Sequence, residues 1–161
     1  MPDGEIWPDD PSAPEVRALL HRHLEFARTH TPPGHVFALD ADGLLDPAVT
    51  LFSFRDGRDV LAVGALRHLD SAHAEVKSMH TAEAARGRGI GRAMLEHLIG
   101  VARARGYSRV SLETGSQAAF GPARALYASA GFQPCEPFAD YAPSPWSAFM
   151  TRSVSQSHEL A

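Results

Sequence analysis

The sequence has a single cysteine, no long apolar run and no excess of positive charge, and each of these absences argues against a class of protein. Cys135 is the single cysteine, so no intrachain disulfide can support the fold. No run of about 18 apolar residues occurs, so the sequence predicts neither a membrane-spanning helix nor a membrane partner. The formal net charge of -4 argues against general nucleic-acid binding. Because residues 1–5 are acidic rather than apolar, we expect no export signal and a cytoplasmic location.

A metal site is not indicated either, although the chain has nine histidines. The histidines are scattered, and the His-Glu-x-x-His spacing of a helical zinc site does not occur. His21 and His23 lie two residues apart in a predicted helix, so they do not share a helical face. We therefore expect no metal cofactor.

What the sequence does have is the composition of one globular domain. It has 161 residues, of which 44% are hydrophobic and 21% are charged. No internal repeat, low-complexity block or linker divides the chain. We predict a single domain over residues 1–152, followed by a polar tail over residues 153–161 that frays.

Hydrophobic periodicity and turn residues predict a mixed α/β sheet. Ser12 and Glu15 resemble a capping box at the start of the first helix. Residues 35–47 are expected to form a loop with a short helical turn. Helices are expected over residues 12–28, from the glycine-rich loop described below to about 105, and over 122–130; strands are expected over residues 49–54, 60–68, 74–80, 109–113, 132–138 and 146–151.

The most informative segment is a glycine-rich loop, Arg86-Gly87-Arg88-Gly89-Ile90-Gly91-Arg92, which leads directly into a helical apolar pattern. Glycines at a helix entrance let the backbone approach a ligand and leave N–H groups free to bind it. The helix dipole and the arginine side chains add positive charge at the same place. Because the chain as a whole is acidic, the loop predicts a site for a small ligand with a phosphate or pyrophosphate group, not for a polyanion.

Two common phosphate-binding loops fit this segment less well. A P-loop requires Gly-x-x-x-x-Gly-Lys-Ser/Thr, and no lysine follows Gly91. A dinucleotide fingerprint requires Gly-x-Gly-x-x-Gly, and here the third glycine comes one residue early. Glu113 does end a predicted strand about twenty residues on, where a ribose-binding acid would lie. Too few strands remain for a doubly wound sheet, so a dinucleotide-binding oxidoreductase stays a remote alternative.

Two motifs together resemble a known family. Arg86-x-x-Gly89-x-Gly91 resembles the Arg/Gln-x-x-Gly-x-Gly/Ala signature of the GNAT family of N-acetyltransferases, and Ala123-x-x-Leu126-Tyr127-x-x-x-Gly131-Phe132 resembles a later helix and exit of that family. Residues 112–115 and 138–141 look like runs found in bacterial members. The resemblance covers residues 49–151. It implies a GNAT-type acyl-CoA N-acyltransferase fold, with a central mixed, mostly antiparallel sheet flanked by helices.

The same resemblance implies acetyl-CoA as the co-substrate. It places the pyrophosphate on the glycine-rich loop and the pantetheine arm along the preceding strand, which in this family splays from its neighbour after a local bulge. Phe120 stands where the family often has an asparagine that contacts the arm, so Ser116 or Gln117 is an alternative donor. The implied cofactor-binding residues are Met79, His80, Thr81, Arg86, Gly87, Arg88, Gly89, Ile90, Gly91, Arg92, Phe120 and Tyr127.

Acetyl transfer to an amine needs an acid, a base and a group that polarises the thioester. Tyr127 resembles the family's general acid, which protonates the departing thiolate. The backbone N–H near Met79 is expected to polarise the thioester carbonyl. Glu75, four residues before Met79, is the candidate base for the amine. The alternative for Glu75 is a strand residue paired with a base such as Lys77 or Arg67.

The predicted reaction moves an acetyl group from acetyl-CoA to a primary amine by direct attack in a ternary complex. No His-Asp arrangement surrounds Cys135 in the sequence, which disfavours an acyl-enzyme. The acceptor, a small-molecule or peptide amine, is expected to contact the first helix, the aspartates of residues 35–46, and residues 138–141. A CoA-binding sensor and a transferase for another acyl-CoA stay open as alternatives. A homodimer is expected by analogy.

Overall fold

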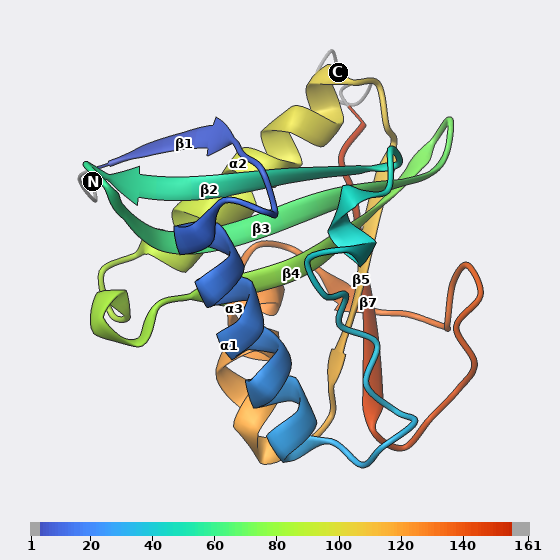
Figure 1. Ribbon diagram of the computed structural model, residues 1–161. Helices are drawn as coiled ribbons and strands as arrows, with labels where there is room; N and C mark the ends of the chain where they lie inside the picture. The colour runs from blue at the N-terminus through green and yellow to red at the C-terminus, as the bar shows by residue number, and fades with distance from the viewer. Residues whose placement is uncertain (1–3, 156–161) are drawn as a thin grey trace.

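A seven-stranded sheet forms the centre of the computed structural model, which describes residues 4–155 (Figure 1). Its strands, in sheet order, are β1 (Glu5–Pro8), β2 (Val49–Asp56), β3 (Asp59–Asp70), β4 (His73–Thr81), β5 (Arg109–Gly115), β7 (Ser147–Ser153) and β6 (Gln133–Pro134). Only the β4–β5 pair is parallel, and the other neighbouring strands are antiparallel. This is the mixed, mostly antiparallel sheet that the sequence predicted.

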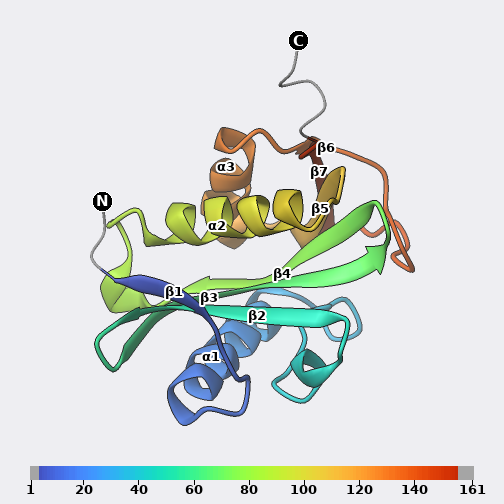
Figure 2. The ribbon, with the colours of Figure 1, turned by 90° about the horizontal axis from the view of Figure 1, so that it is seen from above.

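Helices cover both faces of the sheet, as Figure 2 shows. Helix α1 (Pro14–His30) lies on one face, and α2 (Ile90–Ala104) and α3 (Gly121–Ser129) lie on the other. Three short 3₁₀ turns complete the described part of the chain: η1 (Gly43–Leu45), η2 (Glu83–Ala85) and η3 (Ala118–Phe120). None of the helices within residues 4–155 is long and apolar enough to cross a membrane.

Each face of the sheet has its own hydrophobic core. On one face, Met94 and Leu98 of α2 are fully buried against β3 and β4. On the other, Val16 and Leu20 of α1 pack against β2 and β3. Both helices bury side chains at spacings of three and four residues, which is why the apolar periodicity predicted them. The sheet is therefore packed between helices on both of its faces.

A bulge in β4 opens the sheet beside its parallel neighbour. Lys77 pairs with Ala65 and His80 with Val63, so two residues of β4 lie opposite Gly64 alone. One of them, Ser78, has a left-handed backbone with φ 56. Within the described chain, β4 pairs with β5 only over His73–Glu75, so the two strands separate beyond that point. The splaying of this strand after a bulge was an expectation from the family resemblance, and the strand pairing confirms it.

Gly64 is needed at the bulge because there is no space for a side chain. A Cβ atom on Gly64 would lie 2.8 Å from Met94 Cγ and 2.9 Å from Met79 Sδ. The missing side chain therefore lets Met79 turn toward α2, below the opening between β4 and β5.

The structure differs from the local predictions in four places. The capping box is wrong: α1 begins at Pro14, no side chain caps it, and the Ser12 hydroxyl instead donates to Asp10 Oδ1 at 2.7 Å. The strand β1 was not predicted, and the strand predicted over 132–138 shortens to Gln133–Pro134. The predicted domain boundary at residue 152 falls inside β7, and Val154 is fully buried. The rest of the predicted tail, residues 156–161, lies outside the described residues.

Candidate active site

The glycine-rich loop enters α2 through two left-handed glycines. Gly87 has φ 80 and Gly89, the N-cap of α2, has φ 77. L-residues with side chains rarely adopt this conformation, so glycine is required there by the backbone. No side chain caps α2 in the structure. Its first N–H groups therefore remain available for an anion at the end of the helix that carries partial positive charge.

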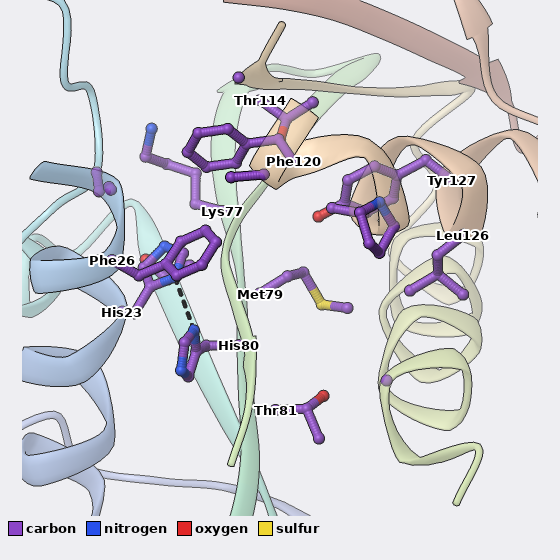
Figure 3. Close-up of a pocket in the computed structure, with 18 of the residues that line it drawn as sticks. His23, Phe26, Lys77, Met79, His80, Thr81, Thr114, Phe120, Leu126 and Tyr127 are labelled. Atoms are coloured by element: carbon purple, nitrogen blue, oxygen red, sulfur yellow. Dashed lines mark hydrogen bonds between the residues drawn. The ribbon is translucent and has the colours of Figure 1, made fainter. Parts of the chain in front are cut away.

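This loop borders a cavity of about 570 Å³, a volume within the ordinary range for small-molecule sites. The cavity lies between the splayed strands β4 and β5, with α1 on one side and α2 and α3 on the other (Figure 3). Eleven of the predicted cofactor-binding residues line it: Met79, His80, Thr81, Arg86, Gly87, Gly89, Ile90, Gly91, Arg92, Phe120 and Tyr127. Arg88 and Glu75 are not among the lining residues.

Two arginines are held at the loop end of the cavity. Arg86 Nε donates to the carbonyl oxygen of Thr81 at 3.2 Å. Arg92 donates from Nη1 to Ser129 Oγ at 2.6 Å and forms an exposed ion pair with Glu96 at 3.3 Å. The cavity therefore has fixed positive charge beside free helix N–H groups, which is the combination that binds a pyrophosphate.

Tyr127 lies at the opposite side of the opening from α1. Its side chain points into the cavity on the side of Met79 (Figure 3). Burial raises the pKa of the Tyr127 hydroxyl well above its usual range, and the charge of Glu113 raises it further. The phenol therefore keeps its proton throughout the neutral range, as a proton donor must.

Glu75 is a buried carboxylate with one hydrogen-bonded oxygen, Oε2, while its other oxygen, Oε1, has no hydrogen-bond partner in the part of the chain that the structure describes. Its side chain is 1% exposed, and Oε2 accepts hydrogen bonds from Lys77 Nζ at 3.2 Å and from the Tyr141 hydroxyl at 2.5 Å. Arg67 lies 3.7 Å from Oε1. The pairing with Lys77 and Arg67 that the sequence left open as the alternative is present. The cavity does not reach the Glu75 carboxylate.

Glu113 is the carboxylate that does line the cavity. It lies on β5, across the opening from Met79 of β4, and burial raises its pKa above the usual value for a glutamate. From the sequence, Glu113 was a candidate only for the ribose-binding acid of a dinucleotide site. The available signal was its position at the end of the strand predicted over 109–113, because residues where a strand gives way to a loop are often presented to ligands.

Comparison with known proteins shows the family. The model of the acetyltransferase (GNAT) family matches residues 13–132. The chain belongs to the GNAT family of acetyltransferases. It is similar to the uncharacterized N-acetyltransferase YsnE of Bacillus subtilis, with 44% identity over 91% of this chain and 97% of that protein. This GNAT protein is therefore an enzyme of the N-acetyltransferase class.

Solved structures agree with this assignment at the level of the fold. A protein of Klebsiella pneumoniae described as an acyl-CoA N-acyltransferase superposes with a TM-score of 0.76 and 26% identity, covering 94% of this chain and 97% of that one. A GNAT acetyltransferase of Elizabethkingia anophelis, solved with acetyl-CoA bound, superposes with a TM-score of 0.68 and 18% identity, covering 92% and 97%. The latter likeness shows a shared fold.

The GNAT cavity is closed on one side by Phe120. A Cβ atom on Gly115 would lie 2.1 Å from the Phe120 ring, so the ring occupies the space above a glycine of β5. Phe120 also contacts the ring of Phe26, with centroids 5.3 Å apart. The alternative donors are engaged elsewhere: Gln117 Nε2 donates to the His30 carbonyl at 2.6 Å, and the Ser116 hydroxyl donates to the Pro145 carbonyl. The Phe120 ring therefore stands where a polar contact was expected, and the donors of Ser116 and Gln117 are used elsewhere.

The aspartates predicted for the acceptor lie away from the main cavity. Asp40 Oδ1 accepts from the backbone N–H of Gly43, and Asp46 Oδ1 accepts from that of Ala48, both at 2.8 Å. Asp140 and Tyr141 line a second cavity on the other side of Lys77. Among residues 4–155, no cluster of three or more His, Cys, Asp or Glu side chains is arranged to hold a metal ion.

A pair of partly buried histidines joins α1 to β4. His23 of α1 and His80 of β4 approach with their Nδ1 atoms 3.2 Å apart (Figure 3). Burial lowers the pKa of His23 to about 3 and that of His80 to about 4. Both rings are therefore neutral at neutral pH, so one Nδ1 donates and the other accepts.

These depressed pKa values predict acid sensitivity of the fold. Below the ordinary histidine pKa of about 6.5, these two imidazoles bind protons in the unfolded chain but not in the folded one. The free energy of unfolding therefore falls as the pH decreases. The loss is up to about 2 kcal/mol per imidazole between about pH 7 and about pH 5. Urea unfolding at the two pH values should show a smaller loss for His23→Gln than for wild type. The exposed His21→Gln variant, the control, should lose stability as wild type does; equal losses in all three would contradict this assignment.

Proposed function

We propose that this GNAT enzyme transfers the acetyl group of acetyl-CoA to a primary amine by direct attack in a ternary complex. The observation that carries the proposal is one continuous cavity. It joins the glycine-rich loop at one end to Tyr127 and Glu113 beside the opening of the sheet. Such a cavity accommodates a long ligand whose phosphates and reactive end need different surroundings.

The donor is proposed to follow the exposed edge of β4. The pyrophosphate binds the N–H groups from Gly87 to Arg92, with Arg86 and Arg92 as charge partners. The pantetheine amides pair with β4 where β5 has separated from it, as an added strand would. The backbone N–H near Met79, next to the bulge, then polarises the thioester carbonyl.

Two side chains are proposed to move the protons. The amine nitrogen attacks the thioester carbon, the C–S bond breaks, and the departing sulfur takes the proton of the Tyr127 hydroxyl. Glu113 accepts the proton that the amine loses as the amide forms. The geometry favours Glu113 over Glu75 for this role, because Glu113 lines the cavity and Glu75 is held by Lys77 and Tyr141. We propose that Glu75 positions those partners.

The Glu113 proposal predicts a pH effect. The base must be ionised, and burial raises its pKa, so kcat/KM of wild type should rise with pH through that raised pKa. Glu113→Gln should lower kcat by about 10²-fold to 10⁴-fold and remove this dependence. The ratio of wild-type to variant kcat/KM, measured with one amine across pH, cancels the ionisation of the amine itself. Glu5→Gln, at an exposed position on β1 away from the cavity, is the control, and a ratio that does not change with pH would reassign the base.

The donor and the reaction are tested separately. Calorimetric titration should show binding of acetyl-CoA and none of NADH; binding of NADH alone would revive the dinucleotide alternative. Mass spectrometry of an amine panel should then show an acetylated product and released CoA. Binding without product from any amine would identify a CoA-binding sensor, and product from another acyl-CoA alone would change the donor.

A further inference from the structure

The charges that line the cavity are few, and most are already engaged. Within the described chain, the charged lining residues other than histidine are Arg86, Arg92, Lys77 and Glu113. The two arginines lie at the loop end, where the proposed pyrophosphate binds. Only Lys77 and Glu113 therefore lie near the opening of the sheet, where an acceptor must meet the thioester.

Lys77 has no donor left for a substrate carboxylate. Its ammonium group donates to Glu75 Oε2 at 3.2 Å, to the Tyr141 hydroxyl at 2.9 Å and to the Phe37 carbonyl at 3.5 Å. An ammonium group has three N–H donors, and these contacts use all three. Lys77 thus links β4 by hydrogen bonds to Phe37, in the segment after α1, and to Tyr141, in the segment before β7.

The acceptor side of the cavity is instead lined by rings. Phe26, Phe37, Phe120 and Trp146 come from four separate segments of the chain, and we call them the aromatic wall. The Phe26 and Phe120 rings meet edge to face, with an interplanar angle of 82°. Figure 3 shows these two rings near each other, Phe26 on α1 and Phe120 from the segment after β5.

The three histidines that line the cavity have hydrogen-bond partners within the protein. His35 Nδ1 lies 3.3 Å from Ser144 Oγ. His23 and His80 bond to each other through Nδ1, and burial keeps both uncharged at neutral pH. Glu113 is the one carboxylate among the described lining residues, and the proposed reaction assigns it to the amine that is acetylated. A second ammonium group or a carboxylate on the substrate would therefore find no free side chain of opposite charge in the described lining of this half of the cavity, which is unfavourable.

From this distribution we infer that the acceptor is an arylalkylamine: one primary amine on a short chain, an aromatic ring that packs on the aromatic wall, and no second charged group. The inference rests on the proposed function and specifies its substrate class. It excludes amino acids, polyamines and polycationic sugars as good acceptors, because each carries a further charge into this half of the cavity.

Matched acceptors test the inference. Phenethylamine should be acetylated with a kcat/KM at least about 100-fold above that of phenylalanine, which adds only a carboxylate. Butylamine should likewise exceed 1,4-diaminobutane, which adds only a second ammonium group. A phenylalanine or diamine rate equal to or above that of its partner would overturn the inference, while product from any of these amines leaves the proposed acetyl transfer intact.

Variants of the wall give a second readout. Phe26→Ala should raise KM for phenethylamine by about tenfold or more, leave KM for butylamine nearly unchanged, and leave the calorimetric Kd for acetyl-CoA unchanged. Trp7→Ala, which removes a ring that is 51% exposed on β1, is the matched control and should change none of the three. An equal rise for both amines would overturn the role of the ring. Loss of acetyl-CoA binding or of all acetylation in wild type would instead overturn the proposed function.

Discussion

Replacing Gly89 with glutamate should raise the Kd for acetyl-CoA by at least about 100-fold. Gly89 has φ 77, where a residue with a side chain costs about 1–2 kcal/mol. The new carboxylate would also stand at the N-terminus of α2, where the proposed pyrophosphate binds, so two anions would compete for the same N–H groups. Calorimetric titration with acetyl-CoA measures the effect directly.

Two control variants separate the contributions to this effect. Gly89→Ala carries the conformational cost without the charge, so it should weaken binding by about tenfold only. Gly57→Glu places the same side chain at another left-handed glycine, with φ 61 and open space around it, in the turn between β2 and β3. It should bind acetyl-CoA as wild type does. Unchanged affinity in Gly89→Glu would remove the glycine-rich loop from the donor site.

Replacing Tyr127 with phenylalanine should lower kcat by about 10²-fold to 10⁴-fold while the Kd for acetyl-CoA changes little. The ring would stay in place because it is buried against Phe132, with centroids 5.9 Å apart. The variant therefore removes the proton of the hydroxyl and keeps the shape of the cavity. Released CoA, followed with saturating amine, measures kcat.

Tyr107→Phe is the matched control for this variant. Its hydroxyl bonds to His68 Nδ1 at 2.6 Å, and Tyr107 does not line the main cavity. It should retain wild-type turnover. Full activity in Tyr127→Phe would reassign the acid, whereas loss of acetyl-CoA binding would show that the hydroxyl binds the donor instead of protonating sulfur.

The central elements of the fold were predictable because their signals are local. Buried positions repeat along α1 and α2 at helical spacing, and Gly57 and Gly106 mark turns that their positive φ values require. The short strand β1 has no such signal. Three of its four residues are exposed, and contacts distant in sequence hold the segment in place, such as the 2.8 Å ion pair between Asp9 and Arg55. The predicted strand over 132–138 contains two prolines, which cannot donate to a sheet and limit it to two residues.

Part of the candidate site, the glycine-rich loop, could also be predicted from the sequence. The spacing of Gly87, Gly89 and Gly91 located the loop, because its function depends on consecutive backbone N–H groups. The choice between Glu75 and Glu113 could not be made in the same way, because each lies on a strand among apolar residues. Only the fold decides that Lys77 and Tyr141 enclose Glu75 while Glu113 borders the opening.

The aromatic wall likewise could not be predicted from the sequence. Phe26 and Phe120 are far apart in the chain and have no shared pattern, and they meet only because α1 and η3 lie on the same side of the opening. The departure of Phe120 from the family asparagine was visible, but the packing partner that explains it was not.

A single-turnover experiment with acetyl-labelled acetyl-CoA and phenethylamine tests the central claim most directly. The reaction is quenched at successive times, and protein, amine and donor are separated before counting. We predict that the label passes to the amine at the rate at which CoA appears, with none accumulating on the protein. Label that stays on acetyl-CoA would contradict acetyl transfer to this amine, and label that first collects on Cys135 would contradict direct attack in a ternary complex.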